Sequence, residues 1–269
     1  MYYQVKKIYP WLYSIKDTDN VFCYLIIGED KALLYDTVYG IGSLPDIIKT
    51  ITDKPVIAVL GHGHIDHANG AYQFDKVWLH ENDFELCRQH TSAAFRRNIL
   101  NNLKNNQVLP ENFDEDKYIN TVTDNFIKLN IGYVFDLGGI TIEVIGMEGH
   151  TSGSIGLLIK EHRVLFNSDA ANFHVWMFLP ESLSINQYMT MLKRTMLLDF
   201  DIFFIGHSNI PLPKTDMQKM INIAQNISIE KSEPYNTSNL FNELNPLVYR
   251  EGDGEIVFTE GKLMNKGNL

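Results

Sequence analysis

Hydrophobic residues in the first sixty positions fall into short runs rich in Val, Ile, Tyr and Phe, and Gly and Asp separate these runs. Branched and aromatic side chains favour extended strands, whereas the separators favour turns. We therefore predict five β-strands: VKKIY, WLYSI, VFCYLIIG, KALLYDT and PVIAVL. Between the last two, Ser43 is placed to cap a helix through Lys49, with Pro45 in its first turn.

The pattern changes after VWLH at 77–80, where apolar and small residues begin to recur at spacings of three or four. This is the period of an amphipathic helix or of a bent helical pair. The positions concerned are Phe84, Cys87, Thr91, Phe95, Ile99 and Leu103. With the polar stretch up to Asn125, they predict a helical insertion over about 82–125 that lies over a sheet.

Strand-forming runs return after this insertion, and helices alternate with them. The predicted strands are FIKLN, ITIEVIG, SIGLLIK, RVLFNS and DIFFIG, with EIVFTE near the end as an edge strand. Ser184 opens one helix, and a second helix covers about 214–229. The order predicts an α/β fold of two halves packed sheet to sheet with helices outside. With 269 residues, 45% of them hydrophobic, a single compact domain over 1–269 is the simplest organisation.

Side chains that can bind a metal follow four of the predicted strands. PVIAVL runs into GHGHIDH, ITIEVIG into MEGHTSGS, RVLFNS into an aspartate and DIFFIG into a histidine. The seven candidates are His62, His64, Asp66, His67, His150, Asp169 and His207. Because loops at strand ends converge on one crevice, we expect these groups to meet.

The spacing within GHGHIDH has a physical reason. A tight turn with glycines lets His62 and His64 point toward one ion, while Asp66 and His67 turn toward a second. Imidazole and carboxylate ligands suit zinc, and an ion with three protein ligands keeps a position open for water. The pKa of that water falls toward ~7, so hydroxide is available at neutral pH. By contrast, the isolated His80, His90 and His162 are expected to be packed or surface residues.

With these motifs the chain resembles the metallo-β-lactamase superfamily, from about Val21 to Pro213. The resemblance is carried by LLYDTVYG, LGHGHIDHANG, GHTSGSIGLLI, LFNSD and FIGHS. It implies a four-layer αββα sandwich with a dinuclear site at one edge of the sheets. It also implies a first metal on His62, His64 and His150, a second on Asp66, His67 and His207, and a bridge through Asp169. Asp36 would support the ligand loop from outside the ligand shell.

The chain departs from the superfamily's usual pattern at several positions. Ser168 stands where glycine usually precedes the bridging aspartate, and Glu148 stands where proline commonly precedes GHT. His64 in place of glutamate separates it from the flavodiiron branch, and Asp169 separates it from the zinc β-lactamases with a cysteine ligand. It is more similar to the glyoxalase II and lactonase-like branches, although Asn172 replaces the lactonase tyrosine.

Composition limits the classes of substrate and the cellular compartments to be considered. The net charge of -10 opposes nucleic acid as a partner. Cys23 and Cys87 are too few for a disulfide framework, so we interpret them as buried or half-buried thiols in a reducing compartment. No segment has the roughly 20 apolar residues that would span a bilayer and no leader is evident, so we expect a cytoplasmic protein without a membrane partner.

A run of aromatic residues follows Asp169 and can form either one wall of a substrate pocket or part of the ordinary core. The candidate pocket residues in this run are Asn172, Phe173, His174 and Trp176. Together with the insertion the run could close an apolar pocket for a small molecule. The apolar surface of the insertion suits a lid or a homodimer interface equally.

Four functional classes are compatible with these residues. The first is a hydrolase holding two zinc ions, with iron or manganese as alternatives, whose hydroxide attacks the carbonyl of a small ester, thioester, lactone or amide. In it Asp66 is the residue whose loss should abolish turnover. The second is a small-molecule phosphodiesterase, although the ligand loops contain no Arg or Lys for its charge. The others are an iron-dependent enzyme similar to persulfide dioxygenases and a non-enzymatic binding module, which should have lost ligands.

Overall fold

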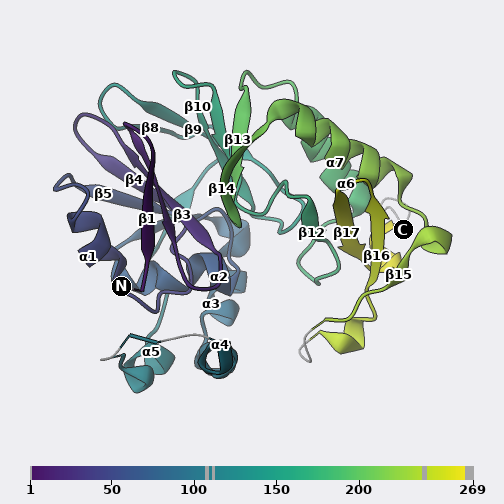
Figure 1. Ribbon diagram of the computed structural model, residues 1–269, viewed down its shortest axis with the longest axis horizontal. Coiled ribbons are helices and arrows are strands. Elements are labelled where there is room, and N and C mark those ends of the chain that lie inside the picture. Colours follow the sequence, from purple (N-terminus) through teal and green to yellow (C-terminus); the bar gives the residue numbers. More distant parts are fainter. Residues whose placement is uncertain (1, 107–108, 111–112, 238–240, 264–269) are drawn as a thin grey trace.

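The computed structural model describes residues 2–106, 109–110, 113–237 and 241–263. Two large sheets face each other in it, with helices outside them (Figure 1). This arrangement confirms the predicted αββα sandwich. Among the described residues, no helix is both long and apolar enough to cross a bilayer.

The first sheet has seven strands in chain order. Its first four strands are antiparallel and its last four are parallel. The strands are β1 (Gln4–Tyr9), β2 (Leu12–Lys16), β3 (Phe22–Ile27), β4 (Ala32–Tyr35), β5 (Val56–Val59), β6 (Val77–His80) and β7 (Phe126–Leu129). The five N-terminal strand predictions and those for VWLH and FIKLN are therefore confirmed.

The second sheet has six strands in the order β14-β13-β11-β10-β9-β8. They are β8 (Val134–Asp136), β9 (Thr141–Gly146), β10 (Ile155–Ile159), β11 (Val164–Phe166), β13 (Ile202–Ile205) and β14 (Ser208–Pro213). β10 is buried along its whole length because it lies inside the sheet and both of its faces are covered. The facing sides of the two sheets share one core, which includes Tyr24, Leu33, Leu157 and Phe166.

Helices cover the outer faces of both sheets. α1 (Leu44–Lys49) lies on the first sheet through Leu44 and Ile48, and Ser43 caps it as predicted. α6 (Ile185–Thr195) and α7 (Lys214–Asn226) lie on the second sheet. α6 begins with a capping box between Ser184 and Gln187, which satisfies backbone groups that the first turn leaves free.

A third sheet, which the sequence did not predict, packs against α7 on the side of the molecule away from the first sheet (Figure 1). Its order is β12 (His174–Trp176), β17 (Gly254–Phe258), β16 (Leu247–Glu251) and β15 (Glu233–Pro234). The prediction that EIVFTE is an edge strand is therefore wrong. β17 lies between β12 and β16 because β12, formed by the aromatic run, pairs with it in parallel.

The insertion is a succession of helices at the edge of the first sheet, as Figure 1 shows. They are α3 (Phe84–His90), α4 (Ala93–Asn106) and α5 (Glu115–Asn120), which agrees with a bent helical pair. The remaining helices are α2 (Ile65–Ala68) and α8 (Glu260–Leu263), with single turns at η1 (Asn69–Gln73), η2 (Glu81–Asp83), η3 (Ile229–Lys231) and η4 (Asn242–Leu244). Cys23 and Cys87 are buried free thiols, as expected.

Candidate metal centre

Four loops beyond strand ends bring the seven predicted ligands together in two groups. The loop from β5 to α2, the loop from β9 to β10, and the segments after β11 and β13 all reach the same edge of the sandwich. The first group is His62, His64 and His150, and the second is Asp66, His67, Asp169 and His207. Within each group one ligand atom per residue lies within 4.8 Å of all the others.

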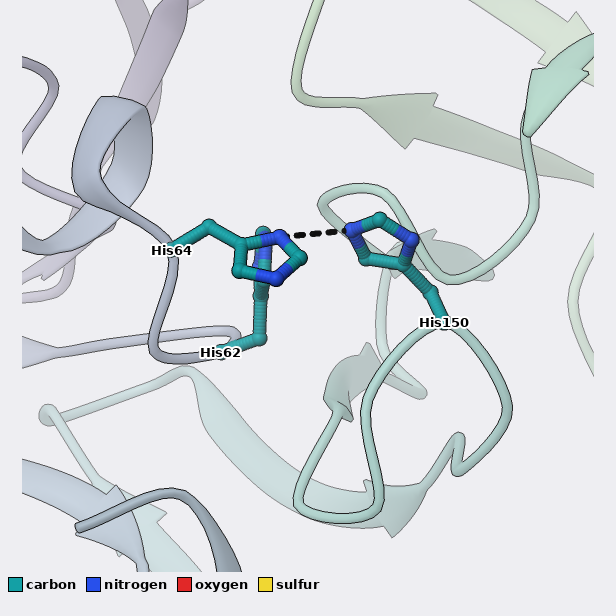
Figure 2. Close-up of side chains that lie close together, drawn as sticks. All are labelled: His62, His64 and His150. Atoms are coloured by element: carbon teal, nitrogen blue, oxygen red, sulfur yellow. Dashed lines mark hydrogen bonds between the residues drawn. The ribbon is translucent and has the colours of Figure 1, made fainter. Parts of the chain in front are cut away.

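The first group consists of three buried imidazoles that face one another (Figure 2). Nδ1 of His64 lies 2.9 Å from Nε2 of His150, and the ring of His62 lies 4.7 Å from that of His64 between centroids. Nε2 of His62 is buried and has no hydrogen-bond partner. An unpaired polar atom inside a protein is costly, so this geometry fits a shared cation.

The second group contains two carboxylates. Oδ2 of Asp169 lies 3.1 Å from Nε2 of His207 and 3.4 Å from Nε2 of His67. Oδ2 of Asp66 lies 3.2 Å from the same His67 atom. Nε2 of His67 and Oδ1 of Asp169 are buried without a hydrogen-bond partner. These atoms too are disposed to hold a cation, and the imidazole and carboxylate donors suit zinc.

In each buried histidine of the two groups, the ring nitrogen that does not face the candidate ligands contacts a polar group outside the seven. Such contacts fix which nitrogen is left to face the centre. The contacts are His62 Nδ1 with Ser168 Oγ at 3.3 Å, His64 Nε2 with Glu181 Oε1 at 2.7 Å, His67 Nδ1 with Asp36 Oδ2 at 3.1 Å, and His150 Nδ1 with the Trp176 carbonyl oxygen at 2.8 Å. Sequence reasoning singled out Asp36 but missed Glu181.

Asp36 joins two ligand loops. Its Oδ1 accepts from Gly61 N at 2.7 Å, and its Oδ2 accepts from Ser168 Oγ at 2.6 Å. Asp36 and Ser168 both have backbone φ angles in the left-handed region, +66° and +49°. This explains why glycine is usual before the bridging aspartate, and the bond to Asp36 offsets the strain at Ser168.

Asp83 is a second buried carboxylate that ties ligand loops together, and the sequence analysis missed it. Its oxygens accept from Gly63 N at 2.9 Å, Gly153 N at 2.8 Å and Thr151 Oγ1 at 2.7 Å. It follows β6 just as the ligands follow their strands, so the strand-end rule could have found it. A side chain at Gly63 would approach Asp83 O and Cys87 N to 3.0 Å, so glycine permits this close packing.

Burial and neighbouring charges separate the pKa values of the histidines. Burial first, and then the nearby histidines, lower the pKa of His62, and burial and His64 lower that of His150 to about 4. Burial lowers the pKa of His67 too, but the charges of Asp66 and Asp169 outweigh this effect, so the pKa of His67 is raised. The pKa of both carboxyls is lowered by His67 and His207 against the effect of burial. Ionised carboxylates and neutral imidazoles are the forms that bind metals.

A cavity of about 480 Å³ adjoins both groups. Of the predicted pocket residues, Asn172, His174 and Trp176 line it. Phe173 is not among the described residues that line it, and its ring packs on Gly254 and beside the Lys219 ammonium on α7, as in the alternative of ordinary core. The lining residues that the sequence analysis did not single out as pocket residues include Tyr39, His90, Phe95, Ile99, Leu179 and Phe241.

The three isolated histidines differ from one another. His90 is packed, as expected, since it stacks on His64 with centroids 4.8 Å apart, and it also lines the cavity, which the sequence did not indicate. His162 stacks on Trp11, and His80 accepts from Asn82 N, so both are structural as expected. His174 is a weak polar contact for a ligand because Glu255 and the Trp176 indole already bond its two ring nitrogens.

Part of the insertion forms a wall of the cavity, and a buried arginine holds this wall in place. Arg96 on α4 is 0% exposed and donates to Asn69 Oδ1 at 2.7 Å and to the carbonyl oxygens of Tyr118 and Thr121. Its guanidinium also lies 5.1 Å from the ring centroid of Tyr72. Asn69 directly follows the ligand-bearing helix α2, so the wall and the metal centre share one anchor.

The chain is similar in sequence to proteins of one superfamily. The model of the metallo-beta-lactamase superfamily matches residues 17–207. The human acyl-coenzyme A thioesterase MBLAC2 is 28% identical over 162 residues, which are 54% of this chain and 56% of that protein. The hydroxyacylglutathione hydrolase GloC of Haemophilus influenzae is 26% identical over 154 residues, 55% of this chain and 65% of that protein. The chain thus spans less than two thirds of the length of either relative.

Solved structures show the same fold. A metallo-beta-lactamase from Pontibacter korlensis matches with a TM-score of 0.58 at 15% identity, covering 84% of this chain and all of that one. An archaeal metallo-beta-lactamase superfamily protein from Sulfolobus tokodaii matches with a TM-score of 0.55 at 19% identity, covering 87% and 93%. At these identities the likeness concerns the fold alone.

Proposed function

The chain belongs to the metallo-beta-lactamase superfamily, and we propose that it is a dinuclear metal-dependent hydrolase of small carboxylic thioesters and esters with an apolar acyl part. Two zinc ions would supply Lewis-acid activation of a water molecule and of the substrate carbonyl. The first group of ligands would hold one ion and the second group the other, with Asp169 as the proposed bridge.

The single observation that supports this substrate class is the cavity beside the ligands. Phe95, Ile99, Leu179 and Phe241 give it apolar walls, and no Arg or Lys is among its described lining residues. A phosphodiester carries a fixed negative charge that calls for such cations. An acyl chain gains by leaving water for this surface, at about 25 cal/mol per Å² of buried apolar area.

The protein's own groups have defined tasks in this proposal. Asp66 lines the cavity, and its carboxylate can accept a hydrogen bond from the attacking water and orient it toward the carbonyl carbon. His64, His150, Asp169 and His207 line the same cavity, so the scissile bond would lie between the two groups. Both curated relatives are named as hydrolases of acyl compounds, which favours a thioester over a lactone or amide.

The test compares carbonyl and phosphate substrates on the purified, zinc-loaded protein. We expect kcat/KM for short acyl thioesters and esters to exceed that for a bis-aryl phosphodiester, and Asp66→Ala to abolish turnover. Asp253→Ala, an exposed aspartate on the β16–β17 turn, is the matched control. A higher kcat/KM for the phosphodiester than for every carbonyl substrate would establish the phosphodiesterase alternative instead. Iron as the metal bound on purification, with no hydrolysis, would favour the redox alternative.

A further inference from the structure

Glu181 lies in the turn that leads from β12 to α6, outside the seven proposed ligands, yet it contacts one of them. Its Oε1 is 2.7 Å from Nε2 of His64, and the two side chains are 18% and 8% exposed. His64 is unlike His67 and His150, whose Nδ1 atoms are held from outside. In His64 it is Nε2 that is held, so Nδ1 is left to face His150.

The turn that carries Glu181 is fastened to the loop of another ligand. Ser182 Oγ donates to the His150 carbonyl oxygen at 2.8 Å, and Leu183 N donates to the Gly149 carbonyl oxygen at 2.8 Å. Lys262 on α8 donates to the Pro180 carbonyl oxygen at 3.3 Å. Glu181 is therefore held in register with the His150 loop while its carboxylate reaches the His64 loop.

The ring of His64 is also confined on one face. His90 stacks on it at 4.8 Å with 21° between the planes, and Phe95 stacks on His90 at 4.6 Å. His64, His90 and Glu181 each offer a ligand atom within 4.8 Å of the others. Ring nitrogens bind a metal in the plane of the ring, and two nearly parallel stacked rings do not direct their lone pairs to one point. The cluster is thus better suited to orienting His64 than to chelating an ion.

Charge gives Glu181 a second effect on the first group. That group offers three imidazoles and no carboxylate, whereas the second group contains Asp66 and Asp169. With the proposed bridge Asp169 as its only carboxylate, a divalent ion on three neutral imidazoles keeps a net positive charge in a buried place, which a further negative group nearby makes less unfavourable. Glu181 is a carboxylate in direct contact with one of those donors.

We propose that Glu181 is a positioning residue of the first ion site, which fixes His64 with Nδ1 toward the ion and adds negative charge beside a ligand set whose only carboxylate would be the bridging Asp169. The proposal rests on the dinuclear function proposed above. Outer partners of metal-binding histidines commonly contribute 10- to 100-fold to metal affinity. The effect should be confined to one of the two ions, because Glu181 contacts no residue of the second group in any bond that the structure shows.

The experiment measures two stepwise zinc affinities of the full chain by competition with a chromophoric chelator. Glu181→Ala removes the charge and the acceptor, whereas Glu181→Gln keeps an acceptor oxygen for His64 Nε2 and removes only the charge. We expect Glu181→Ala to weaken one affinity by about 10- to 100-fold and Glu181→Gln to weaken it less, with the other affinity unchanged. The cobalt-substituted protein should show a changed visible spectrum for that ion alone. Glu85→Gln, with a side chain 71% exposed on α3, is the control.

Each other outcome overturns the inference. Equal weakening of both affinities together with a lower unfolding temperature would show a general structural role, and unchanged affinities would show no role. A third ion per chain that Glu181→Ala removes would make Glu181 a ligand. Wild-type protein that binds two ions and hydrolyses thioesters, with unchanged Glu181 variants, refutes only this inference. Wild-type protein that binds no metal refutes the proposed function as well.

Discussion

The two groups of candidate ligands lie side by side at one sheet edge, but they differ in charge and in exposure to solvent. His62, His64 and His150 are all buried and form a neutral set. The second group has two carboxylates, and the side chain of its His207 is 36% exposed. The second group thus carries two carboxylates of its own, whereas the first group has none of its own and is in contact with a carboxylate outside it, Glu181. One strand-end architecture can therefore produce two sites of different charge and accessibility.

The largest expected effect comes from removing one ligand of each group. His150→Ala should eliminate the ion of the buried set and His207→Ala the ion of the exposed set, each lowering kcat/KM by more than about 100-fold, since even outer partners contribute up to that amount. Metal content measured after gel filtration should fall from about two ions to about one in each variant. Replacing the exposed His162 by Ala is the control. If either variant loses both ions, the two groups do not behave as separate sites.

Asp36→Ala should have a smaller effect, and mainly on the metal affinity of the group that contains His67. Its Oδ2 holds His67 Nδ1, so the ion of the carboxylate-containing group should bind about 10- to 100-fold more weakly. Its bond to Gly61 N also supports the loop of His62, so a slight loss at the other ion is expected. Zinc competition measures both affinities, with Asp75→Ala on an exposed turn as the control. Unchanged affinities would mean that Asp36 is only a turn residue.

Lowering the pH should produce the smallest difference between the two sites. Each pH unit below the pKa of one competing histidine lowers the metal affinity of its site by about tenfold. The pKa of His67 and of His207 is raised by the neighbouring carboxylates against burial, so protons compete with metal there already near neutral pH. In the first group burial opposes the shift but Glu181 raises the pKa of His64, so protons compete with metal at this one ligand. Burial and nearby histidines lower the pKa of His62, and burial and His64 lower that of His150 to about 4, so these two stay neutral as the pH falls. The second group thus has two competing histidines where the first has one. Zinc content after dialysis between pH 7.5 and 5 should therefore fall first by the ion of the second group. The same titration of His207→Ala should then show only the later loss; an early loss there would reverse the assignment.

The sequence predicted what depends on local pattern and missed what depends on distant packing. Strand ends located all seven candidate ligands because residues that leave neighbouring strands must meet at one edge, and Ser43 and Ser184 marked helix starts by their own side chains. Glu181 carries no such local signal, since its partner His64 is 117 positions away. The third sheet was hidden for the same reason. Its β12 is only three residues long and pairs with β17 far along the chain, which is why EIVFTE was wrongly predicted to be an edge strand.

Some predictions stay predictions because neither the fold nor the positions of the candidate ligands test them. They include the cytoplasmic location, the single-domain organisation, the choice of zinc over iron or manganese, and a homodimer interface on the insertion. None of them follows from the geometry of the ligand loops, because the same donors serve several metals and compartments.

The hydrogen bonds of Arg96 affect how the proposed enzyme would select its substrates, because they determine whether the cavity wall on α4 can move during turnover. Swinging α4 away from the cavity would strip a buried guanidinium of its acceptors on Asn69, Tyr118 and Thr121, and each lost bond to a charged donor costs about 1.5–3 kcal/mol. Such an opening is rare, so each catalytic cycle would proceed without a closing step of this wall. Substrates would then be selected by whether their acyl part is short enough for a cavity of fixed length. The turnover rate would be limited by the chemical step or by product release.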